Sequence, residues 1–535
     1  MPRKNFKQIL RGITVALGIT TICLFWLLDP LVNSSHNAIY HWDSSAAQLF
    51  VTPMADFCAF WLLLALMFIF AGRKLRLAMW CGTIALTPWV DLENWGYLSH
   101  SKIPNWLSIL VLVAGLSAFP FLLALWRSEF EGKFKQIEEF ATAVFISSAF
   151  CGLVILSRYA WFGWQARSLN AGLSSHGPVH QTPAQEGRPR VIWILFDELS
   201  YKQVYERRFP GLQLPAFDAL AAQATVFTHT IPSGGMTEII LPSLLMGAPF
   251  DEIRPSTNGK QLFVHNERTR TWQRFDEHNT VFQDALNLNY RTAVAGWYNP
   301  YCRILPDVLD HCFWSFSYPA PNTMLPGAAL ESNLMQPWIH FFRDGIGYRV
   351  ASSFLHVFGQ NALDTRQHIS DYEALAEAAD RMLEDRSSGF LLIHMPIPHP
   401  NGIYDRRTDR FALARSNYLD NVALADKFLK HVRSELEQSG QWDDSTIVVT
   451  GDHSWRTVSM WKDTPEWTKE EEIASQGGQF DDRPAYIVKL PEQRSGARIE
   501  APFAALNTRR LFDALLEQKI RSKEQLSAWA IQSVR

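Results

Sequence analysis

Apolar residues are concentrated in five long runs within the first 163 residues of the chain. The runs lie at about Ile13–Leu28, Met54–Ala71, Leu77–Val90, Trp106–Trp126 and Ala141–Trp161. A membrane-spanning helix needs roughly 20 mostly apolar residues. The second, fourth and fifth runs reach this length, and the first does so with its flanking residues, whereas the third is short, contains Pro88 and ends at Asp91. The pattern predicts an α-helical membrane domain of five spans over residues 1–163. Core helices of a soluble domain are the alternative, but they would leave this stretch almost no polar surface.

Positive charges alternate between the connections of these runs. They cluster before the first run, after the second and after the fourth, at Arg3, Lys4, Lys7, Arg11, Arg73, Lys74, Arg76, Arg127, Lys133 and Lys135. Residues 30–53 carry none, and residues 92–105 carry only Lys102. Because loops rich in Lys and Arg stay in the cytoplasm, we expect a cytoplasmic N-terminus and an uncleaved anchor. The chain after the fifth span is then expected outside a bacterial inner membrane, on the periplasmic or extracellular side.

The rest of the chain changes character twice. Residues 164–190 are rich in Ser, Gly, Pro and Gln and have no apolar period, so they are predicted to be a linker. From residue 191 to 535, apolar strand-like runs alternate with helical patterns. Strands are expected at Arg190–Phe196, Thr225–Thr230, Arg291–Trp297, Phe390–Met395, Thr446–Thr450 and Ala485–Leu490, and helices at Leu214–Gln223, 371–384, 415–438 and 507–518. This alternation predicts an α/β fold with a mostly parallel central sheet covered by helices.

Charge and cysteine content narrow the class of protein. The chain has 50 Lys and Arg against 53 Asp and Glu, and this near balance argues against a nucleic-acid binder. Four of the six cysteines lie in the apolar runs, at Cys23, Cys58, Cys81 and Cys151. The other two, Cys302 and Cys312, lie ten positions apart in the part expected outside the cytoplasm. An oxidising compartment favours a disulfide between them, and a pair of free buried thiols is the alternative.

Candidate metal ligands follow three of the predicted strands. Asp197 and Glu198 come after the first, and Asp452 and His453 follow the strand at Thr446–Thr450. The strand at Phe390–Met395 brings His394 and, just after it, His399. In open sheets of this type, ligands bind at the carboxyl ends of the strands. Each residue alone is more often a helix cap or a structural residue, so the prediction depends on their convergence. Carboxylates with imidazole suit zinc or manganese, whereas oxygen ligands alone would suit calcium or magnesium.

A hydroxyl residue supplies a candidate nucleophile. Thr237 follows the Ser233–Gly235 stretch and opens an apolar, helix-like run. A hydroxyl at a helix N-terminus lies in a positive potential, and coordination to a metal would lower its pKa further. By local chemistry alone, a simple N-cap role for Thr237 is an equal alternative.

Several ordered motifs in the C-terminal part resemble the sulfatase and alkaline-phosphatase superfamily. The stretch TEIILPSLLMG (237–247) matches, in length and in its ending, the C-x-P-S-R-x-x-L-L-T-G stretch of sulfatases. It places Thr237 at the position of the nucleophile. VIWILFDEL resembles the opening strand with its metal-binding Asp197, and TGDHS resembles the metal-binding element with Asp452 and His453. IHMPIPHP resembles the segment whose His contacts the substrate oxyanion, here His399. The likeness covers roughly residues 190–517 and implies an alkaline-phosphatase-like fold that binds a divalent metal, with zinc expected first.

The chain departs from the sulfatase pattern at the nucleophile. Formylglycine maturation needs a Cys or Ser, so a Thr implies the chemistry of phosphodiesterases and of phosphoethanolamine and phosphoglycerol transferases. Five anchor spans before the catalytic part also resemble those transferases. The resemblance thus implies metal-dependent transfer or hydrolysis of phosphate esters, with a phospholipid head group or envelope glycan as substrate. Alternatives are a sulfuric ester or phosphonate hydrolase and a non-catalytic membrane-anchored binding protein.

Further substrate contacts are expected from His394, His399 and Arg456. Arg456 could bind a phosphate oxygen bidentately, or could pair with surface carboxylates. Glu198 is expected either to support the metal ligands or to be exposed.

Overall fold

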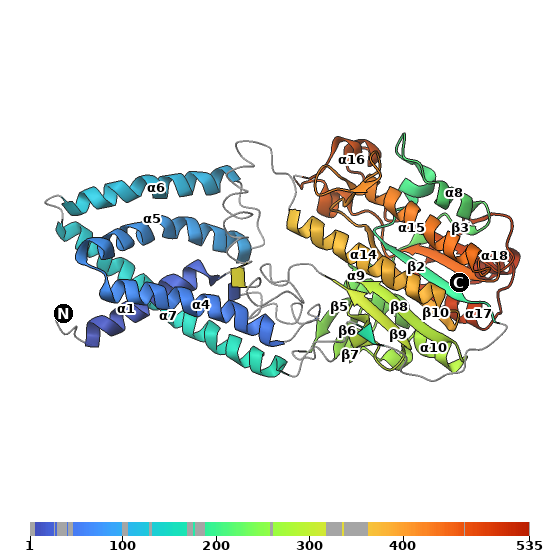
Figure 1. Cartoon of the computed structure of the whole chain (residues 1–535), viewed down its shortest axis with the longest axis horizontal. Coiled ribbons are helices and arrows are strands. Elements are labelled where there is room, and N and C mark those ends of the chain that lie inside the picture. The colour runs from blue at the N-terminus through green and yellow to red at the C-terminus, as the bar shows by residue number, and fades with distance from the viewer. Residues whose placement is uncertain are drawn as a thin grey trace. The chain divides into compact units, whose positions relative to one another are not determined.

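The computed structural model describes residues 6–25, 27–28, 40, 46–98, 105–127, 131–167, 175–176, 188–256, 261–316, 334–335, 362–464 and 466–533. These residues form two compact units, one before residue 170 and one over 175–316 and 362–533 (Figure 1).

The N-terminal unit consists of long helices. They are α1 (Phe6–Cys23), α4 (Ala46–Phe70), α5 (Arg73–Leu98), α6 (Asn105–Arg127) and α7 (Glu131–Ala166). Among the described residues, four stretches are long and apolar enough to cross a membrane, namely Phe6–Cys23, Phe50–Phe70, Trp106–Ala124 and Lys135–Ala166. The third predicted run does form a helix, α5, which continues through Pro88, but α5 is not among these four. These helices suggest membrane anchoring, and the number of spans stays a prediction.

The C-terminal unit is built on a mixed sheet in which nine strands can be described. Its order is β1-β9-β8-β10-β2-β13-β14-β3-β15. The strands are β1 (Ser175–His176), β2 (Val191–Asp197), β3 (Thr225–Phe227), β8 (Arg291–Trp297), β9 (His311–Ser315), β10 (Ser388–Pro398), β13 (Thr446–Gly451), β14 (Tyr486–Lys489) and β15 (Ala497–Ile499). The central strands β8, β10, β2 and β13 are all parallel to one another. Their carboxyl ends therefore meet at one edge of the sheet.

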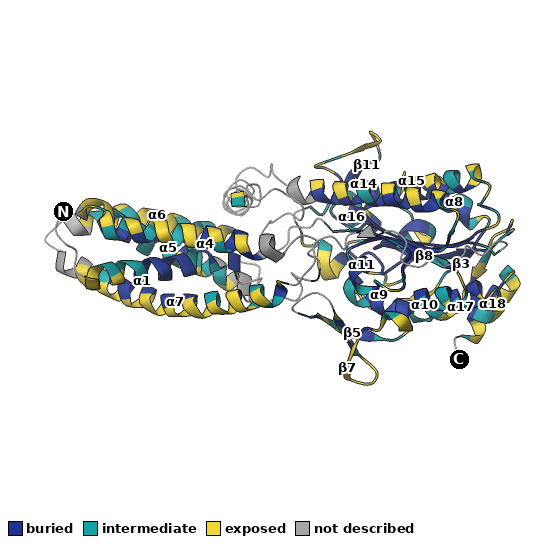
Figure 2. Ribbon diagram, turned by 60° about the horizontal axis from the view of Figure 1, so that its bottom comes forward, coloured by how far each residue is buried: buried dark blue, intermediate teal, exposed yellow. Residues whose placement is uncertain are grey.

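Helices cover both faces of this sheet. Figure 2 shows α14 (Ala362–Glu384), α15 (Tyr418–Gln438) and α8 (Pro215–Ala221) on one face, and α9 (Thr237–Met246), α10 (Val281–Asn287), α17 (Thr508–Leu516) and α18 (Lys523–Gln532) on the other. Strands covered on both faces read as continuous apolar runs, and all seven residues of β2 are buried. The predicted α/β class and its mostly parallel sheet are confirmed.

The structure differs from the sequence prediction where strands are short. The predicted strand at Thr225–Thr230 is interrupted by a bend at Thr228, so that β3 stays in the main sheet. Its second part, β4 (Thr230–Ile231), pairs with β16 (Phe503–Ala504) in a separate sheet. The late strand β14 runs antiparallel to β13, and β1 in the predicted linker pairs with β9. A strand of two or three residues has no apolar period that a sequence could reveal.

A small sheet that the sequence analysis did not predict follows α9. The strands β5 (Phe250–Pro255), β6 (Leu262–Asn266) and β7 (Thr271–Arg274) form an antiparallel sheet of their own. All four residues of β7 are exposed, which leaves this strand without the apolar alternation that marks a half-buried strand.

Candidate metal centre and nucleophile

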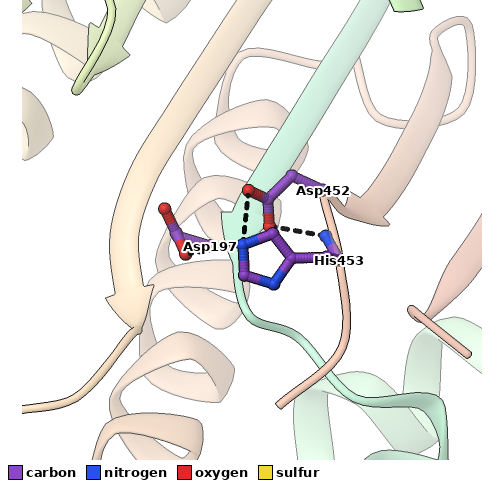
Figure 3. Close-up of side chains that lie close together, drawn as sticks. All are labelled: Asp197, Asp452 and His453. Carbon is purple, nitrogen blue, oxygen red and sulfur yellow. Dashed lines mark hydrogen bonds and ion pairs between the residues drawn. The ribbon is translucent and has the colours of Figure 1, made fainter. Parts of the chain in front are cut away.

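The ends of two neighbouring parallel strands bring the predicted metal ligands together. Asp197 is the last residue of β2, and Asp452 follows Gly451, which pairs with Phe196. Asp197, Asp452 and His453 each offer a ligand atom, and these three atoms lie within 4.8 Å of one another (Figure 3). All three residues are buried. The convergence that the sequence predicted is present in the fold.

Thr237 lies at the first position of α9, between the two carboxylates. Its Oγ1 is 2.8 Å from Asp452 Oδ2 and 3.1 Å from Asp197 Oδ2. A threonine hydroxyl has one proton and can donate to only one of these oxygens at a time. The other contact then brings two oxygen atoms together without a hydrogen between them. A cation coordinated by all three oxygens would remove that conflict.

The imidazole of His453 directs its Nε2 atom toward the carboxylates of Asp452 and Asp197. Its Nδ1 is 3.0 Å from the carbonyl oxygen of Ser454, which can only accept a hydrogen bond, so Nδ1 carries the proton. Nε2 then has a free lone pair, 3.3 Å from Asp452 Oδ2 and 3.8 Å from Asp197 Oδ1. Neither Nε2 nor Asp197 Oδ1 has a hydrogen-bond partner among the described residues, although both atoms are buried.

The electrostatics of the cluster also favour a cation. Burial, followed by the negative charge of Asp452, raises the pKa of Asp197 well above its ordinary value. Asp452 Oδ1 accepts hydrogen bonds from the backbone N–H groups of Glu198 (3.0 Å) and His453 (2.7 Å), so that Oδ2 remains for the cluster. Three oxygens and one imidazole nitrogen match the ligands that zinc and manganese prefer. Asp197, Thr237, Asp452 and His453 therefore fit one divalent cation.

The two other predicted histidines occupy different positions. His399 comes directly after β10, and its ring lies between those of Trp297 and Trp461, at centroid distances of 5.3 Å and 5.2 Å. Burial, and next the charge of Arg456, lowers the pKa of His399 well below its ordinary value, so the ring is neutral at pH 7. A ligand atom of His399 lies within 4.8 Å of those of Asp197 and Glu198, which places it beside the metal cluster.

His394 lies further back, inside β10, where it pairs in register with Leu195. Its Nδ1 is 2.8 Å from the hydroxyl oxygen of Tyr301, while its buried Nε2 has no hydrogen-bond partner among the residues that can be described. Burial lowers the pKa of His394 to about 4. A contact of His394 with substrate stays a prediction.

Arg456 has a partner that the sequence did not suggest. It forms an ion pair with Glu198, whose side chain is fully buried, and this corrects the expectation that Glu198 might be exposed. Trp461 donates its indole N–H to the same carboxylate, at 3.0 Å from each oxygen. Trp461 is 263 residues away from Glu198 in the chain, and no sequence motif connects the two.

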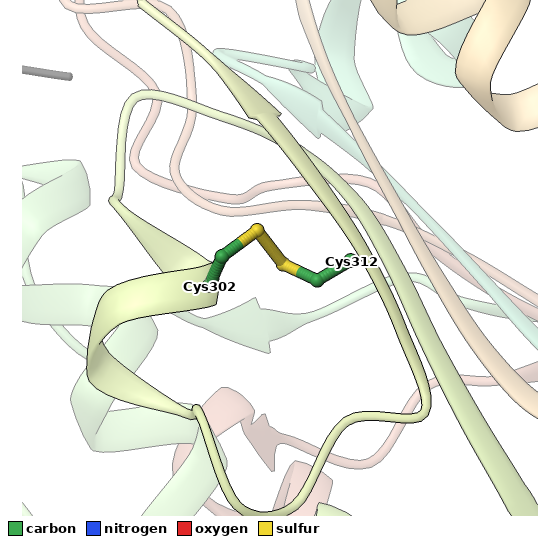
Figure 4. The surroundings of a disulfide bond; sticks show 2 residues. All are labelled: Cys302 and Cys312. Atoms are coloured by element: carbon green, nitrogen blue, oxygen red, sulfur yellow. A yellow bond between two sulfur atoms is a disulfide. The ribbon is translucent and has the colours of Figure 1, made fainter. Parts of the chain in front are cut away.

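A disulfide joins the short helix after β8 to the neighbouring strand β9. Cys302 in α11 (Tyr301–Ile304) is joined to Cys312 in β9, with an S–S distance of 2.01 Å (Figure 4). This confirms the predicted bridge and excludes the alternative of two free thiols. Because Tyr301 directly precedes Cys302, the bridge also fixes the short helix that carries the hydroxyl partner of His394.

A comparison with known families agrees with this geometry. The family model described as Sulfatase matches residues 189–485, which is more than half of the chain. The chain belongs to the sulfatase family. This confirms the resemblance stated from the motifs and identifies the C-terminal unit as a sulfatase-family hydrolase. Enzymes of this superfamily use a divalent metal ion, in keeping with the cluster around Asp197.

Three solved structures illustrate what the chain is similar to. A phosphonate monoester hydrolase of Agrobacterium radiobacter is 15% identical, with 61% of this chain and 74% of that chain covered and a TM-score of 0.36. A sulfatase from a Pseudoalteromonas species is 14% identical, with 62% of this chain and 68% of that chain covered and a TM-score of 0.39. An alkaline phosphatase superfamily protein from Vibrio parahaemolyticus is 13% identical, with 65% of this chain and 70% of that chain covered and a TM-score of 0.32. A search of curated proteins found none that matches this chain in sequence.

Proposed function

We propose that this sulfatase-family chain transfers or hydrolyses phosphate esters, with Thr237 as the nucleophile. The observation that carries the proposal is the contact of the Thr237 hydroxyl with both Asp197 and Asp452 at the N-terminus of α9. A structural N-cap hydroxyl would accept a hydrogen bond from the backbone of its own helix. Thr237 instead donates to a buried carboxylate and is the first residue of the helix, after the cap residue Met236.

The residues of the site have distinct roles in this proposal. Asp197, Asp452, His453 and Thr237 would hold one divalent cation, for which zinc is the first choice. When bound, such an ion supplies positive charge that lowers the pKa of the Thr237 hydroxyl and stabilises negative charge on phosphate oxygens. The Thr237 hydroxyl, which lies 2.8 Å from Asp452 Oδ2, would lose its proton to solvent, so that both carboxylates stay available as ligands. Thr237 Oγ1 then attacks phosphorus as the bond to one ester oxygen breaks, and the departing oxygen takes up a proton from water and leaves as the alcohol. The product on the protein is a phosphothreonine, which keeps the second ester group where the substrate is a diester.

The second half of the reaction regenerates the hydroxyl. His399, neutral and beside the cluster, offers a hydrogen bond to a phosphate oxygen or to the departing alcohol. Water then attacks the phosphothreonine in a hydrolase, and an acceptor hydroxyl does so in a transferase. The segment Gly234–Met236, directly before the buried Thr237, is exposed to solvent. The apolar helices of the N-terminal unit favour a phospholipid head group or an envelope glycan as the substrate, at the outer face of a bacterial inner membrane.

Hydrolysis of sulfate esters is the second candidate, and the family match favours it. Thr237 argues against it, because a threonine cannot be converted to formylglycine. The stretch also has Leu241 where the sulfatase motif has Arg.

The test compares turnover of bis(p-nitrophenyl) phosphate and p-nitrophenyl sulfate by the full chain, with metal content measured on the same samples. Thr237→Ala should lower diester turnover by at least about 10³-fold, and Thr237→Ser should keep part of it because the hydroxyl remains. Asp452→Asn should lose metal as well as activity, since a neutral amide is a poorer zinc ligand. Thr280→Ala is the matched control, because Thr280 is also buried at a helix N-terminus but has no carboxylate partner there.

Two outcomes would contradict the proposal. Wild-type turnover by Thr237→Ala at equal metal occupancy would make a water molecule the nucleophile. Metal-loaded wild-type protein that turns over neither ester would favour a non-catalytic binding protein.

A further inference from the structure

Glu198 is the most completely bonded carboxylate near the metal cluster. Its Oε1 accepts hydrogen bonds from Arg456 Nε at 2.7 Å and from Arg456 Nη2 at 2.5 Å. Its Oε2 accepts one from the backbone N–H of Arg456 at 3.2 Å, and Trp461 donates to both oxygens. Glu198 also has a φ of +66°, a left-handed conformation that is uncommon for residues other than glycine. Bonds from several directions therefore hold this carboxylate in one orientation, directed at Arg456.

The opposite side of the Arg456 guanidinium contacts the segment that leads into Thr237. Nη1 donates to the carbonyl oxygen of Gly235 at 3.2 Å and lies 3.5 Å from Met236 Sδ. The guanidinium thus lies between Glu198 and the two residues that precede the proposed nucleophile. Glu198 itself directly follows the cluster residue Asp197. A positive charge at this point lies beside the place where the proposed reaction brings a phosphate group.

The balance of charge around the cluster depends on this pair. Arg456 is always protonated, and Glu198 neutralises it at hydrogen-bond distance. Asp197 and Asp452 then remain as the two carboxylates of the cluster, and one divalent cation balances their charges. The loaded site would therefore carry no net positive charge. Without Glu198, the same site would carry one.

We propose that the buried Glu198–Arg456 pair determines the charge of the substrate. By neutralising Arg456, Glu198 favours esters with one negative charge, such as phosphodiesters, over esters with two, such as phosphate monoesters. This inference rests on the proposed function, because it assumes that one cation and one phosphate group meet at Thr237. Glu198 and Arg456 act here as specificity and positioning residues, and neither takes part in the bond changes.

The experiment measures kcat/KM of the full, metal-loaded chain for bis(p-nitrophenyl) phosphate and for p-nitrophenyl phosphate, which carries two charges at pH 8. Glu198→Gln keeps the size of the side chain and leaves Arg456 without a counter-charge. We expect the ratio of diester to monoester to fall by about tenfold, because an unbalanced charge a few ångströms away favours the dianion. Arg456→Gln should change the ratio in the opposite direction, since its site has one negative charge in excess.

The double variant Glu198→Gln/Arg456→Gln separates charge from position. It removes the pair but keeps the net charge of the wild type, so its ratio should return toward the wild-type value even if both rates are low. Trp461→Phe is the matched control, because it removes hydrogen bonds to Glu198 without changing any charge. Its ratio should equal that of the wild type.

Three outcomes would overturn the inference. An unchanged ratio in Glu198→Gln at wild-type metal content would leave the pair a purely structural role. Loss of metal from Glu198→Gln would make Glu198 a ligand, as its closeness to Asp197 and His399 allows. A low ratio that persists in the double variant would make position, not charge, the cause.

Binding measurements keep this test separate from that of the proposed function. Calorimetric titration with inorganic phosphate and with dimethyl phosphate compares a mostly dianionic and a monoanionic ligand without any turnover. If Thr237 is not the nucleophile, Glu198→Gln should still shift these two affinities toward the dianion. If the affinities do not shift while turnover depends on Thr237, the inference fails and the proposed function stands.

Discussion

The two units of the chain place the same kinds of side chain in opposite ways. In the N-terminal unit, large apolar residues of the long helices face outward, and Leu62, Phe121 and Phe150 are each at least 60% exposed (Figure 2). In the C-terminal unit, comparable residues lie inside, and Trp193 and Phe196 of β2 are completely buried. An apolar exterior has a low free energy only where the surroundings are themselves apolar, as in a bilayer. The difference is in keeping with membrane anchoring of the N-terminal unit, which its apolar helices suggest.

Their interiors differ for the same reason. Between helices in lipid, close approach of the backbones replaces the hydrophobic effect as a source of stability. A Cβ atom added to Gly18 of α1 would lie 1.8 Å from the carbonyl oxygen of Phe145 in α7, and one added to Gly115 would lie 2.3 Å from that of Ala85. The sheet unit instead fills its core with large rings, such as Trp193 against Phe512 at a centroid distance of 4.9 Å.

An enzyme that is active only outside the cytoplasm can report on which side of the membrane the C-terminal unit lies. This test has the largest expected effect, because the reporter is either active or inactive. Alkaline phosphatase fused after residue 170 should be active, because the charge pattern of the loops places the C-terminal unit outside the cytoplasm. The same reporter fused near residue 75, in a loop rich in Lys and Arg, should be inactive. The measurement is enzyme activity per amount of fusion protein in intact cells. The reverse pattern would refute the topology and, with it, the assignment of an outer-face substrate.

Adding one methyl group at Gly18 tests whether the helices α1 and α7 pack as closely as the structure shows. Gly18→Ala should destabilise the helical unit by about 2 kcal/mol, because the added Cβ collides with the backbone of α7. Helix propensity alone predicts the opposite sign, a gain of roughly 1 kcal/mol. Gly72→Ala is the control, since no atom beyond Gly72 itself and its two chain neighbours lies within 4 Å of the added Cβ. The midpoint of thermal unfolding in detergent micelles should fall for Gly18→Ala only, and a rise would show that α1 and α7 are not in close contact.

Loss of the disulfide should destabilise the C-terminal unit and leave the N-terminal unit unaffected. Replacing Cys302 and Cys312 by Ser should lower the free energy of unfolding of the C-terminal unit by about 2–3 kcal/mol, as expected for a short closed loop. Cys151→Ser, in the helical unit, should leave it unchanged because this thiol is free. Denaturant unfolding of the full chain, followed by the fluorescence of the sheet unit, measures both. Equal stability with and without reductant would contradict the prediction.

The sequence revealed those features of the molecule that follow from long patterns or compact motifs. The helices of the N-terminal unit, the central strands and the cluster of Asp197, Asp452 and His453 were all readable, because each depends on local residues whose types are selective. The small sheet of β5, β6 and β7 was not readable, because its strands are short and all four residues of β7 are exposed. The pairing of Glu198 with Arg456 was not readable either, since it joins residues 258 positions apart. Such contacts depend on how the strands are ordered in the sheet, which the hydrophobic pattern does not specify.

In the proposed reaction, Thr237 becomes covalently modified during turnover. The most direct measurement quenches the metal-loaded full chain in acid while it turns over bis(p-nitrophenyl) phosphate, and maps the protein by mass spectrometry. We expect an ester of phosphate on the peptide that contains Thr237. It should be absent from Thr237→Ala and present in the Thr280→Ala control. A wild-type sample that turns over the diester at its full rate, but shows no modification of this peptide in aliquots quenched within the first catalytic cycle, would contradict the covalent mechanism.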